Sequence, residues 1–445
     1  MIALVAVAIY ALALWGFFNP FVGLMGLLAV SIIQPGELYP ALGAFHIERV
    51  LFFVVFVSFV WRHGKPVFPP ITKLFLLFWS TMFLSVPFAF WRMGALQFAL
   101  DFGRVAIYHI LIVNLVNTPR RFRIFLLVFA LLIGWLAGSS CLGFLHGDLY
   151  LERGRFARAE GMTSSGGNPN ELGITLVSSL PLVVLLVVDK PWRGRLLGLA
   201  VAALSGWVLV FTGSRTSIVA LLFLLAAFVF SSKKRLLFLP IGVILLAVTW
   251  QVMPVEYQER YLSVATRDQD ESYTNRLLAW QAGWHMFLDY PVTGVGGGQF
   301  QVANGAKYWP GEGQKVWLNA HSLYFQIIAE LGLCGTAAFC AYLFALFRLN
   351  RSLGKELSLL PDAPAWLRHY PLACSLILLV LLFVGYAAHD LYRSTWYMLG
   401  ALSGCAHTVI GHLGEEETPT TEKEPIGLTA SSRTSNSSQE VVERF

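Results

Sequence analysis

The sequence predicts an all-α integral membrane protein with 12 or 13 transmembrane helices. Hydrophobic residues make up 56% of the 445-residue chain, and mean hydropathy is +0.63. Charged residues make up only 13%, about half the share of a soluble globular chain. Apolar runs of membrane-spanning length alternate with short segments that hold most of the Lys and Arg, as in multi-pass membrane proteins.

The apolar runs follow one another along the chain, with one long interruption after residue 252. They lie near residues 1–17, 20–34, 47–61, 72–90, 98–117, 122–146, 170–188, 196–212, 215–231, 236–252, 321–347, 370–388 and 394–411. The first two runs are short, so either a re-entrant pair or one tilted span fits them. Residues 1–18 lack a basic n-region and an Ala-x-Ala site, so we expect a retained membrane segment rather than a cleaved signal peptide.

Five basic clusters set the orientation of the chain. Each is separated from the next by two spans, so all five fall on one side, which the positive-inside rule assigns to the cytoplasm. The clusters are Arg62/Lys65/Lys73, Arg120/Arg121/Arg123, Lys190/Arg193/Arg195, Lys233/Lys234/Arg235 and Arg348/Arg351/Lys355. The opposite side, periplasmic in a bacterium, receives residues 91–97, 147–169, 212–215, 253–320 and 389–393.

This topology divides the chain into four parts. Residues 1–252 form an N-terminal transmembrane bundle, 253–320 a periplasmic loop, and 321–411 the C-terminal transmembrane helices. Residues 412–445 are rich in Glu, Ser and Thr and too poor in apolar residues to form a core, so we expect a disordered cytoplasmic tail.

Composition also excludes several functions. The five cysteines lie in apolar runs without CxxC spacing, which argues against a disulfide framework and a zinc site. The net charge of +6 comes mostly from the cytoplasmic loops and forms no nucleic-acid footprint. There is no Walker lysine or GxSxG elbow, and the external acidic residues Asp268, Asp270 and Glu271 show no metal arrangement. We therefore expect neither a metal nor a cofactor.

Four polar clusters on the external side are candidates for a functional site, because polar groups at span ends are costly unless they serve a purpose. The first is the turn Thr212–Ser217, whose Ser and Thr side chains can cap the next helix. In this turn Ser214 is a candidate substrate-binding residue, and Arg215 projects at the N-terminal end of the span. A helix N-terminus already attracts anions, so an arginine there strengthens an anion site. The alternative is an arginine that reaches to lipid headgroups.

The second cluster is Asn319–Tyr324, at the start of a span. His321 can exchange a proton near neutral pH, which suits a general base acting on a hydroxyl, and Tyr324 follows about one turn later. The alternative is an interfacial histidine that binds headgroups or backbone.

The fourth cluster, Gly166–Asn170, precedes another span: Asn168 can cap that helix, and the amides of Asn168 and Asn170 can also contact a polar ligand.

The third cluster lies in the long loop. Arg276 is a second candidate anion ligand, and the alternative is an ordinary interfacial arginine. Apolar residues recur after it at helical spacing, which predicts an amphipathic helix on the membrane surface; they are Leu277, Trp280, Trp284 and Phe287. The run Gly294–Gly298, with Gly296 and Gly297 at its centre, allows close approach of the backbone to a ligand.

These motifs resemble those of the O-antigen ligase and O-antigen polymerase superfamily. The resemblance covers roughly residues 205–335, and its residues are TGSR (212–215), GVGGGQF (294–300), AHSLYFQIIAELG (320–332) and the PN pair at 169–170. The opening FFNPFVGLMGLLAVSIIQPGELYP (17–40) looks closest to the O-antigen-ligase-like proteins of exopolysaccharide systems.

The resemblance implies a GT-C-like fold and an enzyme of the bacterial inner membrane with its active face in the periplasm. It implies metal-independent, inverting transfer of a glycan from an undecaprenyl-diphosphate carrier to an acceptor hydroxyl. Arg215 and Arg276 would hold the diphosphate and His321 would activate the acceptor, whereas His285 and His389 receive no role. Partners would be the donor, a lipid, glycan or protein acceptor, and membrane lipids, but no nucleic acid.

Three classes of function compete: a glycosyltransferase, a transporter and a structural partner. A ligase ranks above a polymerase of the same superfamily, mainly because of the opening segment. A small-anion transporter is the alternative from another class, but transporters usually place polar residues and broken helices near mid-membrane. Here most charges gather at span ends, although Asp101 and Arg104 lie within an apolar run. A structural partner in a polysaccharide export complex is a third possibility.

Overall fold

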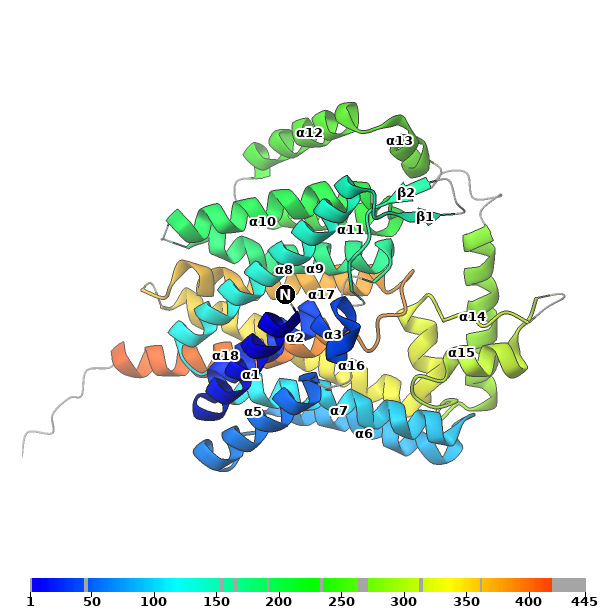
Figure 1. Cartoon of the computed structure of the whole chain (residues 1–445), viewed down its shortest axis with the longest axis horizontal. Helices are drawn as coiled ribbons and strands as arrows, with labels where there is room; N and C mark the ends of the chain where they lie inside the picture. The colour runs from blue at the N-terminus through cyan, green and yellow to red at the C-terminus, as the bar shows by residue number, and fades with distance from the viewer. Residues whose placement is uncertain are drawn as a thin grey trace, which may run out of the picture.

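The computed structural model shows a helical membrane bundle (Figure 1). It describes residues 2–43, 47–152, 156–163, 167–189, 192–232, 235–262, 271–311, 315–360 and 362–417. Every predicted apolar run coincides with a helix, which confirms an all-α integral membrane protein. Within the described residues, eight helices are long and apolar enough to cross a membrane; they are α6 with η1, α7, α8, α9, α10, α12, α16 and α17.

The helices on the predicted apolar runs are α1 (Ile2–Phe18), α2 (Pro20–Ile33), α5 (Ile47–His63), α6 (Pro70–Ser85), α7 (Arg92–Leu115), α8 (Pro119–His146), α9 (Pro169–Val188), α10 (Trp192–Phe211), α11 (Arg215–Ser231), α12 (Arg235–Val252), α16 (Leu323–Ser358), α17 (Ala365–Val384) and α18 (Ser394–Glu417). Short elements connect them: α3 (Pro35–Leu38), α4 (Pro40–Gly43), η1 (Val86–Phe88), β1 (Tyr150–Glu152), β2 (Phe156–Arg158), α13 (Val255–Leu262), α14 (Glu271–Asp289), α15 (Phe300–Ala303) and the π-helix η4 (Asn304–Tyr308).

The two ends of the bundle differ in character. The β1–β2 hairpin, α13, α14 and α15 lie together at one end, which we call the loop end (Figure 1). The long helices α16 and α18 finish at the other end, the basic end. There Arg123 at the start of α8 forms an ion pair of 2.7 Å with Asp189 at the end of α9. The separation of the loop end from the basic end agrees with the predicted orientation.

The first two helices form a short antiparallel hairpin. They are joined at Asn19, whose side chain caps α2 by accepting from the backbone amide of Phe21 at 3.2 Å. A Cβ added to Gly16 would lie 2.9 Å from the Cα of Gly23, so the two glycines let the helices touch. At 1.5 Å per residue, α2 is about 21 Å long and thus shorter than a ~30 Å hydrocarbon core. A re-entrant pair fits this geometry.

Helix α16 is broken at Gly332, and the long loop repairs the break. Gly332 has φ +58° and ψ −156°, which interrupts the helical hydrogen bonds. Leu333 and Cys334 donate instead to the backbone carbonyls of Pro291 and Val292, at 2.9 and 3.1 Å. Irregular backbone at membrane depth is tolerated where protein satisfies it, so this loop segment is part of the bundle rather than a loose connection.

Helix α14 lies across the loop end, roughly perpendicular to the long helices (Figure 1). One face is fully buried against the protein through Ala279, Ala282 and Met286. Leu277 and Trp284 stay exposed on another face. The predicted helix in the loop is therefore present. Leu277 and Trp284 of the stripe expected to face the membrane stay exposed, whereas Trp280 of that stripe packs on Phe325.

Two boundaries differ from expectation. The segment 147–169 contains a two-stranded antiparallel hairpin in which Leu151 pairs with Ala157, although no strand was predicted there. Helix α18 continues to Glu417, so residues 412–417 belong to it rather than to the expected disordered tail. The rest of that tail, 418–445, lies outside the described residues.

Candidate functional site

The first turns of α9 are the place where the predicted motifs meet. Asn168 caps this helix, because its side-chain oxygen accepts from the amides of Asn170 at 3.0 Å and Glu171 at 3.2 Å. Gly173 packs against the start of α11, since a Cβ there would lie 2.2 Å from the Oγ of Ser217. The cap predicted for Asn168 is thus present, and α9 brings the PN motif against the TGSR motif.

The turn before α11 is built as the sequence suggests. Gly213 has φ +56°, a left-handed conformation that favours glycine. Ser214 caps the helix by accepting from the amide of Ser217 at 3.3 Å, and the Ser217 hydroxyl donates to Ser214 Oγ at 2.8 Å. Arg215 is the first residue of α11 and is half-buried. Its role as a diphosphate ligand stays a prediction.

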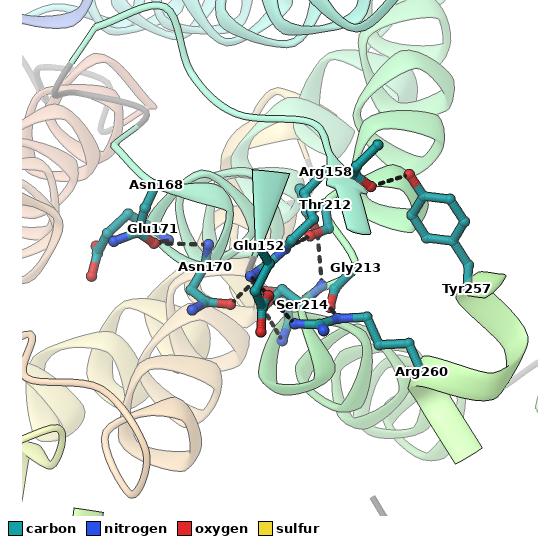
Figure 2. Close-up of polar contacts among 12 residues, drawn as sticks. Glu152, Arg158, Asn168, Asn170, Glu171, Thr212, Gly213, Ser214, Tyr257 and Arg260 are labelled. Carbon is teal, nitrogen blue, oxygen red and sulfur yellow. Dashed lines mark hydrogen bonds and ion pairs between the residues drawn. The ribbon is translucent and has the colours of Figure 1, made fainter. Parts of the chain in front are cut away.

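Two other arginines hold this turn in place, and together with Glu152 we call them the arginine clamp (Figure 2). Arg158 Nε donates to the carbonyl of Thr212 at 2.6 Å, and Arg260 Nε donates to the carbonyl of Gly213 at 2.6 Å. Both guanidinium groups also pair with the same Glu152 oxygen, at 2.7 and 2.6 Å. The clamp therefore fixes two consecutive carbonyls immediately before Ser214.

The clamp also contacts α9, and its two arginines share one carboxylate. Arg158, which is 4% exposed, donates through Nη2 to the side-chain oxygen of Asn170 at 2.8 Å. Burial favours a higher pKa for Glu152, but the two arginines outweigh it and hold the pKa of that carboxyl below its usual value. No role was predicted for Glu152 or Arg260, because Arg260 lies 108 positions from Glu152 in the chain.

A pair of histidines forms a second cluster at the loop end. The rings of His321 and His389 meet edge to face, with centroids 5.3 Å apart. His321 has φ +46°, unusual for a residue with a side chain. Burial, and then the charges of His389 and Arg276, lower the pKa of His321 to about 4. The charge of Arg276 thus acts on His321, and His389, which had no assigned role, lies against the His321 ring.

Three charged residues surround the histidine pair. Arg393 forms an ion pair with Glu171, and its Nη1 donates to Thr175 Oγ1 at 3.0 Å. Asp390 is 4% exposed, and among the described residues no other residue donates a hydrogen bond to either carboxylate oxygen. Arg393 Nε lies 4.0 Å from Asp390 Oδ2. Burial raises the pKa of Asp390 to about 7, with Arg393 opposing the shift. We call His321, His389, Glu171, Asp390 and Arg393 the histidine cluster.

The glycine run has a structural role in the described protein. Gly296 donates to the backbone carbonyl of Glu330 at 3.0 Å, and Gly297 donates to Ser85 Oγ at 3.3 Å. A Cβ on Gly294 would lie 2.3 Å from the Glu330 carbonyl carbon. The run thus docks the loop onto α16 just before its break. A role of Gly296 and Gly297 in substrate binding stays a prediction.

The remaining predicted ligand also has a protein partner. The Tyr324 hydroxyl donates to the backbone carbonyl of Leu382 at 2.8 Å, which ties the first turn of α16 to α17. The residue is 46% exposed, and its role in substrate binding stays a prediction. Within the described ranges, no group of three or more His, Cys, Asp and Glu side chains could hold a metal ion.

The residues that sequence reasoning missed fall into two kinds. His389, Asp390 and Arg393 lie within five residues between two apolar spans, and that density of ionisable groups at a span end was a usable signal. The clamp residues Glu152 and Arg260 lie in loops 108 positions apart. No local pattern links them, so only the folded chain reveals their contact.

The comparisons with known proteins agree with the motifs. No curated protein matches this chain. Residues 199–340 match the model of the O-antigen ligase family. This segment runs from α10 through Arg215, Arg276 and His321 into α16, so it contains the three residues predicted to act on the substrate. The chain is a multi-pass membrane protein, and its segment 199–340 is similar to the O-antigen ligase family, whose members are glycosyltransferase-like.

Proposed function

We propose that the chain is a ligase-type glycosyltransferase, which moves a glycan from an undecaprenyl-diphosphate carrier to an acceptor hydroxyl on the periplasmic face of the bacterial inner membrane. One observation carries the proposal. The start of α9 joins the turn before Arg215 to the cluster around His321, and the charge of Arg276 acts on His321. Three groups suited to a diphosphate and a hydroxyl therefore belong to one end of the bundle.

The proposed reaction is a direct displacement. The acceptor oxygen attacks the anomeric carbon of the donor glycan, and a new carbon–oxygen bond forms as the bond to the diphosphate oxygen breaks. The electron pair of that bond leaves with the diphosphate, and attack from the opposite side inverts the anomeric centre. The proton of the acceptor hydroxyl passes to an imidazole nitrogen of His321.

The state of His321 supports its role as proton acceptor. A general base must be unprotonated when the acceptor arrives. Since burial and the neighbouring charges lower the pKa of His321 to about 4, its imidazole is neutral at physiological pH. His389 lies against it, with ring centroids 5.3 Å apart.

Arginine charge would stabilise the leaving group. Guanidinium groups bind phosphate oxygens bidentately and stay charged at any relevant pH. Arg215 stands at the N-terminus of α11, where the helix dipole adds positive potential. In this scheme Arg215 and Arg276 supply the charge stabilisation that other enzymes obtain from a bound metal, so transfer should not need one.

The test is transfer by purified full-length protein in detergent, with an undecaprenyl-diphosphate glycan as donor and EDTA present. Lipid A core, a lipid-linked glycan and a serine-containing protein are offered in parallel. Product on the lipid or protein acceptor supports a ligase, whereas product on the lipid-linked glycan alone makes the protein a polymerase. No product from folded protein would contradict the proposal and favour an anion transporter. An absolute need for a divalent metal would contradict the metal-independent mechanism.

A further inference from the structure

A tryptophan in the long loop exposes a ring that the proposed reaction has not used. Helix α15, the π-helix η4 and the segment 315–318 form what we call the loop cap, next to α14 at the loop end (Figure 1). Asn304 of η4 joins its parts, because Asn304 Nδ2 donates to the backbone carbonyls of Val316 and Leu318 at 3.4 and 3.3 Å. Trp317 lies between these two residues in the chain and is 53% exposed. The loop cap therefore fixes the backbone around Trp317 while the side chain stays accessible.

The indole ring of Trp317 packs flat on the backbone of Gly305. A Cβ added to Gly305 would lie 2.3, 2.6 and 2.7 Å from the ring atoms Cδ2, Cγ and Cε2 of Trp317. All three atoms belong to the five-membered ring, so the glycine approaches the face of the indole and not one edge. One face is thus covered by protein, and the exposed surface of the ring belongs mainly to the opposite face.

Polar side chains flank the ring on two sides. Gln301 Nε2 donates to the backbone carbonyl of Trp317 at 2.9 Å. Lys315 Nζ donates to the backbone carbonyl of Ala306, the neighbour of Gly305, at 2.8 Å. Gln301 and Lys315 are both exposed. The amide oxygen of Gln301 takes no part in its bond, and an ammonium group has three N–H donors. An apolar ring face therefore has hydrogen-bonding groups at its rim.

A sugar ring has the chemistry that matches this surface. A pyranose presents C–H groups on its faces and hydroxyl groups around its edge. The face of an aromatic ring carries partial negative charge and attracts polarised C–H groups. Sites for small molecules likewise combine apolar surface with a few placed polar groups. The alternative is an indole that anchors the loop among lipid headgroups. Anchoring does not require a ring fixed on a glycine with an amide and an ammonium group beside it, so the arrangement favours a sugar.

The position of Trp317 also fits a glycan. Trp317 precedes His321 by four residues, and four extended residues span at most about 14 Å. The proposed reaction brings a glycan to His321. The next sugars of the same glycan therefore pass within reach of the exposed indole face.

We propose that Trp317 is the platform of a glycan-binding subsite, which binds a pyranose ring adjacent to the reacting sugar of the donor or acceptor glycan. The inference rests on the proposed function and adds a second point of contact with the glycan. A single sugar held at His321 does not extend to Trp317, whereas a longer glycan contacts both. Affinity should therefore rise with the number of sugars.

The test compares donors that carry one sugar or several sugars on the same undecaprenyl diphosphate. In wild-type protein we expect the KM of the longer donor to be roughly three- to tenfold lower, from one stacked ring. Trp317→Ala should abolish this difference, and Trp317→Tyr should retain most of it. Gly305→Ala should also reduce it, because the added methyl group displaces the indole. The control is Trp284→Ala on α14, which removes another exposed indole and should retain the full difference; Trp284 is 47% exposed.

The same variants are then tested with a short and a long acceptor glycan, which distinguishes the two sources of the sugar. A length preference that Trp317→Ala abolishes supports the subsite, and the substrate that shows it is the one bound there. Three results overturn the inference: no length preference in wild-type protein for either glycan, a preference that survives Trp317→Ala, and an equal loss in Trp284→Ala. The last of these would assign the ring to membrane anchoring.

A second measurement covers a variant that does not fold. Photoreactive donor and acceptor glycans of several sugars are crosslinked to wild-type protein. Labels on the loop cap support the subsite, and labels confined to other parts of the chain overturn it. Crosslinking needs binding but not transfer. An absence of transfer by wild-type protein therefore contradicts the proposed function, while the labels still decide the fate of the subsite.

Discussion

The arginine clamp and the histidine cluster both contact the first turns of α9, but they use their polar groups differently. In the clamp, Arg158 and Arg260 share Glu152 and bind the carbonyls before Ser214 at 2.6 Å. In the histidine cluster, Asp390 is buried, and no other described residue donates a hydrogen bond to it. A cluster that satisfies its own polar groups holds structure, whereas unsatisfied buried groups mark a place where chemistry or a ligand completes the bonding.

The same contrast assigns different tasks to arginines that look alike in the sequence. Arg158 lies in a basic segment and could have been taken for an anion ligand, yet its guanidinium is occupied by Glu152, Thr212 and Asn170. The clamp instead sets the position of the turn that presents Arg215. Breaking the clamp should therefore weaken activity indirectly, and breaking the catalytic groups should abolish it.

The largest effect is expected for His321→Ala. Loss of a general base typically reduces a rate by roughly 100- to 10,000-fold, so transfer should fall by that order. Donor binding should persist, because the arginines remain. Transfer and donor binding are measured separately on purified protein, with His285→Ala on the exposed side of α14 as the matched control. Loss of donor binding would reassign His321 from the acceptor to the donor.

The pH dependence of this step has a definite direction. The pKa of His321 is lowered to about 4, so the neutral base persists as the pH falls from 7 to 6. Protonation of His321 should reduce transfer only as the pH approaches 4. A loss of activity centred near the ordinary histidine pKa of about 6.5 would instead identify His389 as the titrating base. That loss should then be absent from the His389→Gln variant.

Arg215→Ala should reduce transfer by roughly 100- to 1000-fold, since removing one group that stabilises developing negative charge usually costs that much. The protein should still insert and accumulate, because the clamp and the Ser214 cap do not depend on this side chain. Transfer is compared with Arg351→Ala, an exposed arginine at the basic end. Activity near wild type would remove Arg215 from the diphosphate site.

Glu152→Gln should have an intermediate effect, through structure. It removes the charge between two arginines and should destabilise the fold by about 1–3 kcal/mol, a value reduced because Glu152 is 32% exposed. We expect kcat to fall more than donor affinity changes. Thermal unfolding in detergent and transfer kinetics are compared with Glu259→Gln, an exposed carboxylate next to Arg260. A fully active and stable Glu152→Gln variant would show that the clamp does not position Arg215.

The smallest effect is a change in stability at Asp390. Its pKa is about 7 in the folded protein, above the ordinary value of about 3.9. The folded state thus keeps a proton that the unfolded state loses, and wild-type stability should decline as pH rises from about 4 to 7. Asp390→Asn lacks this loss and should melt a few degrees higher than wild type at pH 8, on the order of 2–4 °C.

The same comparison of melting temperatures at low pH tests this prediction. At pH 5 the Asp390 carboxyl is protonated in the folded protein, so the advantage of Asp390→Asn should shrink toward zero. Asp362→Asn, at an exposed position, serves as the control and should show no such trend. An advantage of Asp390→Asn that is equal at both pH values would mean that Asp390 does not titrate in this range.

Local sequence determined most of the secondary structure, because a membrane helix forms mainly where a run of apolar residues enters the lipid. Apolar runs predicted the long helices of the bundle, and the basic clusters predicted which ends lie together. Capping is equally local: Asn168 was predicted as the cap of α9, and a Ser or Thr of the turn 212–217 as the cap of α11, a place that Ser214 takes. The motifs around Arg215, Arg276 and His321 were also visible in the sequence.

Tertiary structure decided which polar groups at the loop end remain available to bind a ligand. The sequence does not show that Arg260 and Glu152 meet across 108 positions, that His389 lies against His321, or that the glycine run docks on α16. It also does not show that the indole of Trp317 packs flat on Gly305. The physical reason is that helix formation and capping depend on neighbours in the chain, whereas the bonding of a charged side chain depends on partners that only folding brings within 3 Å.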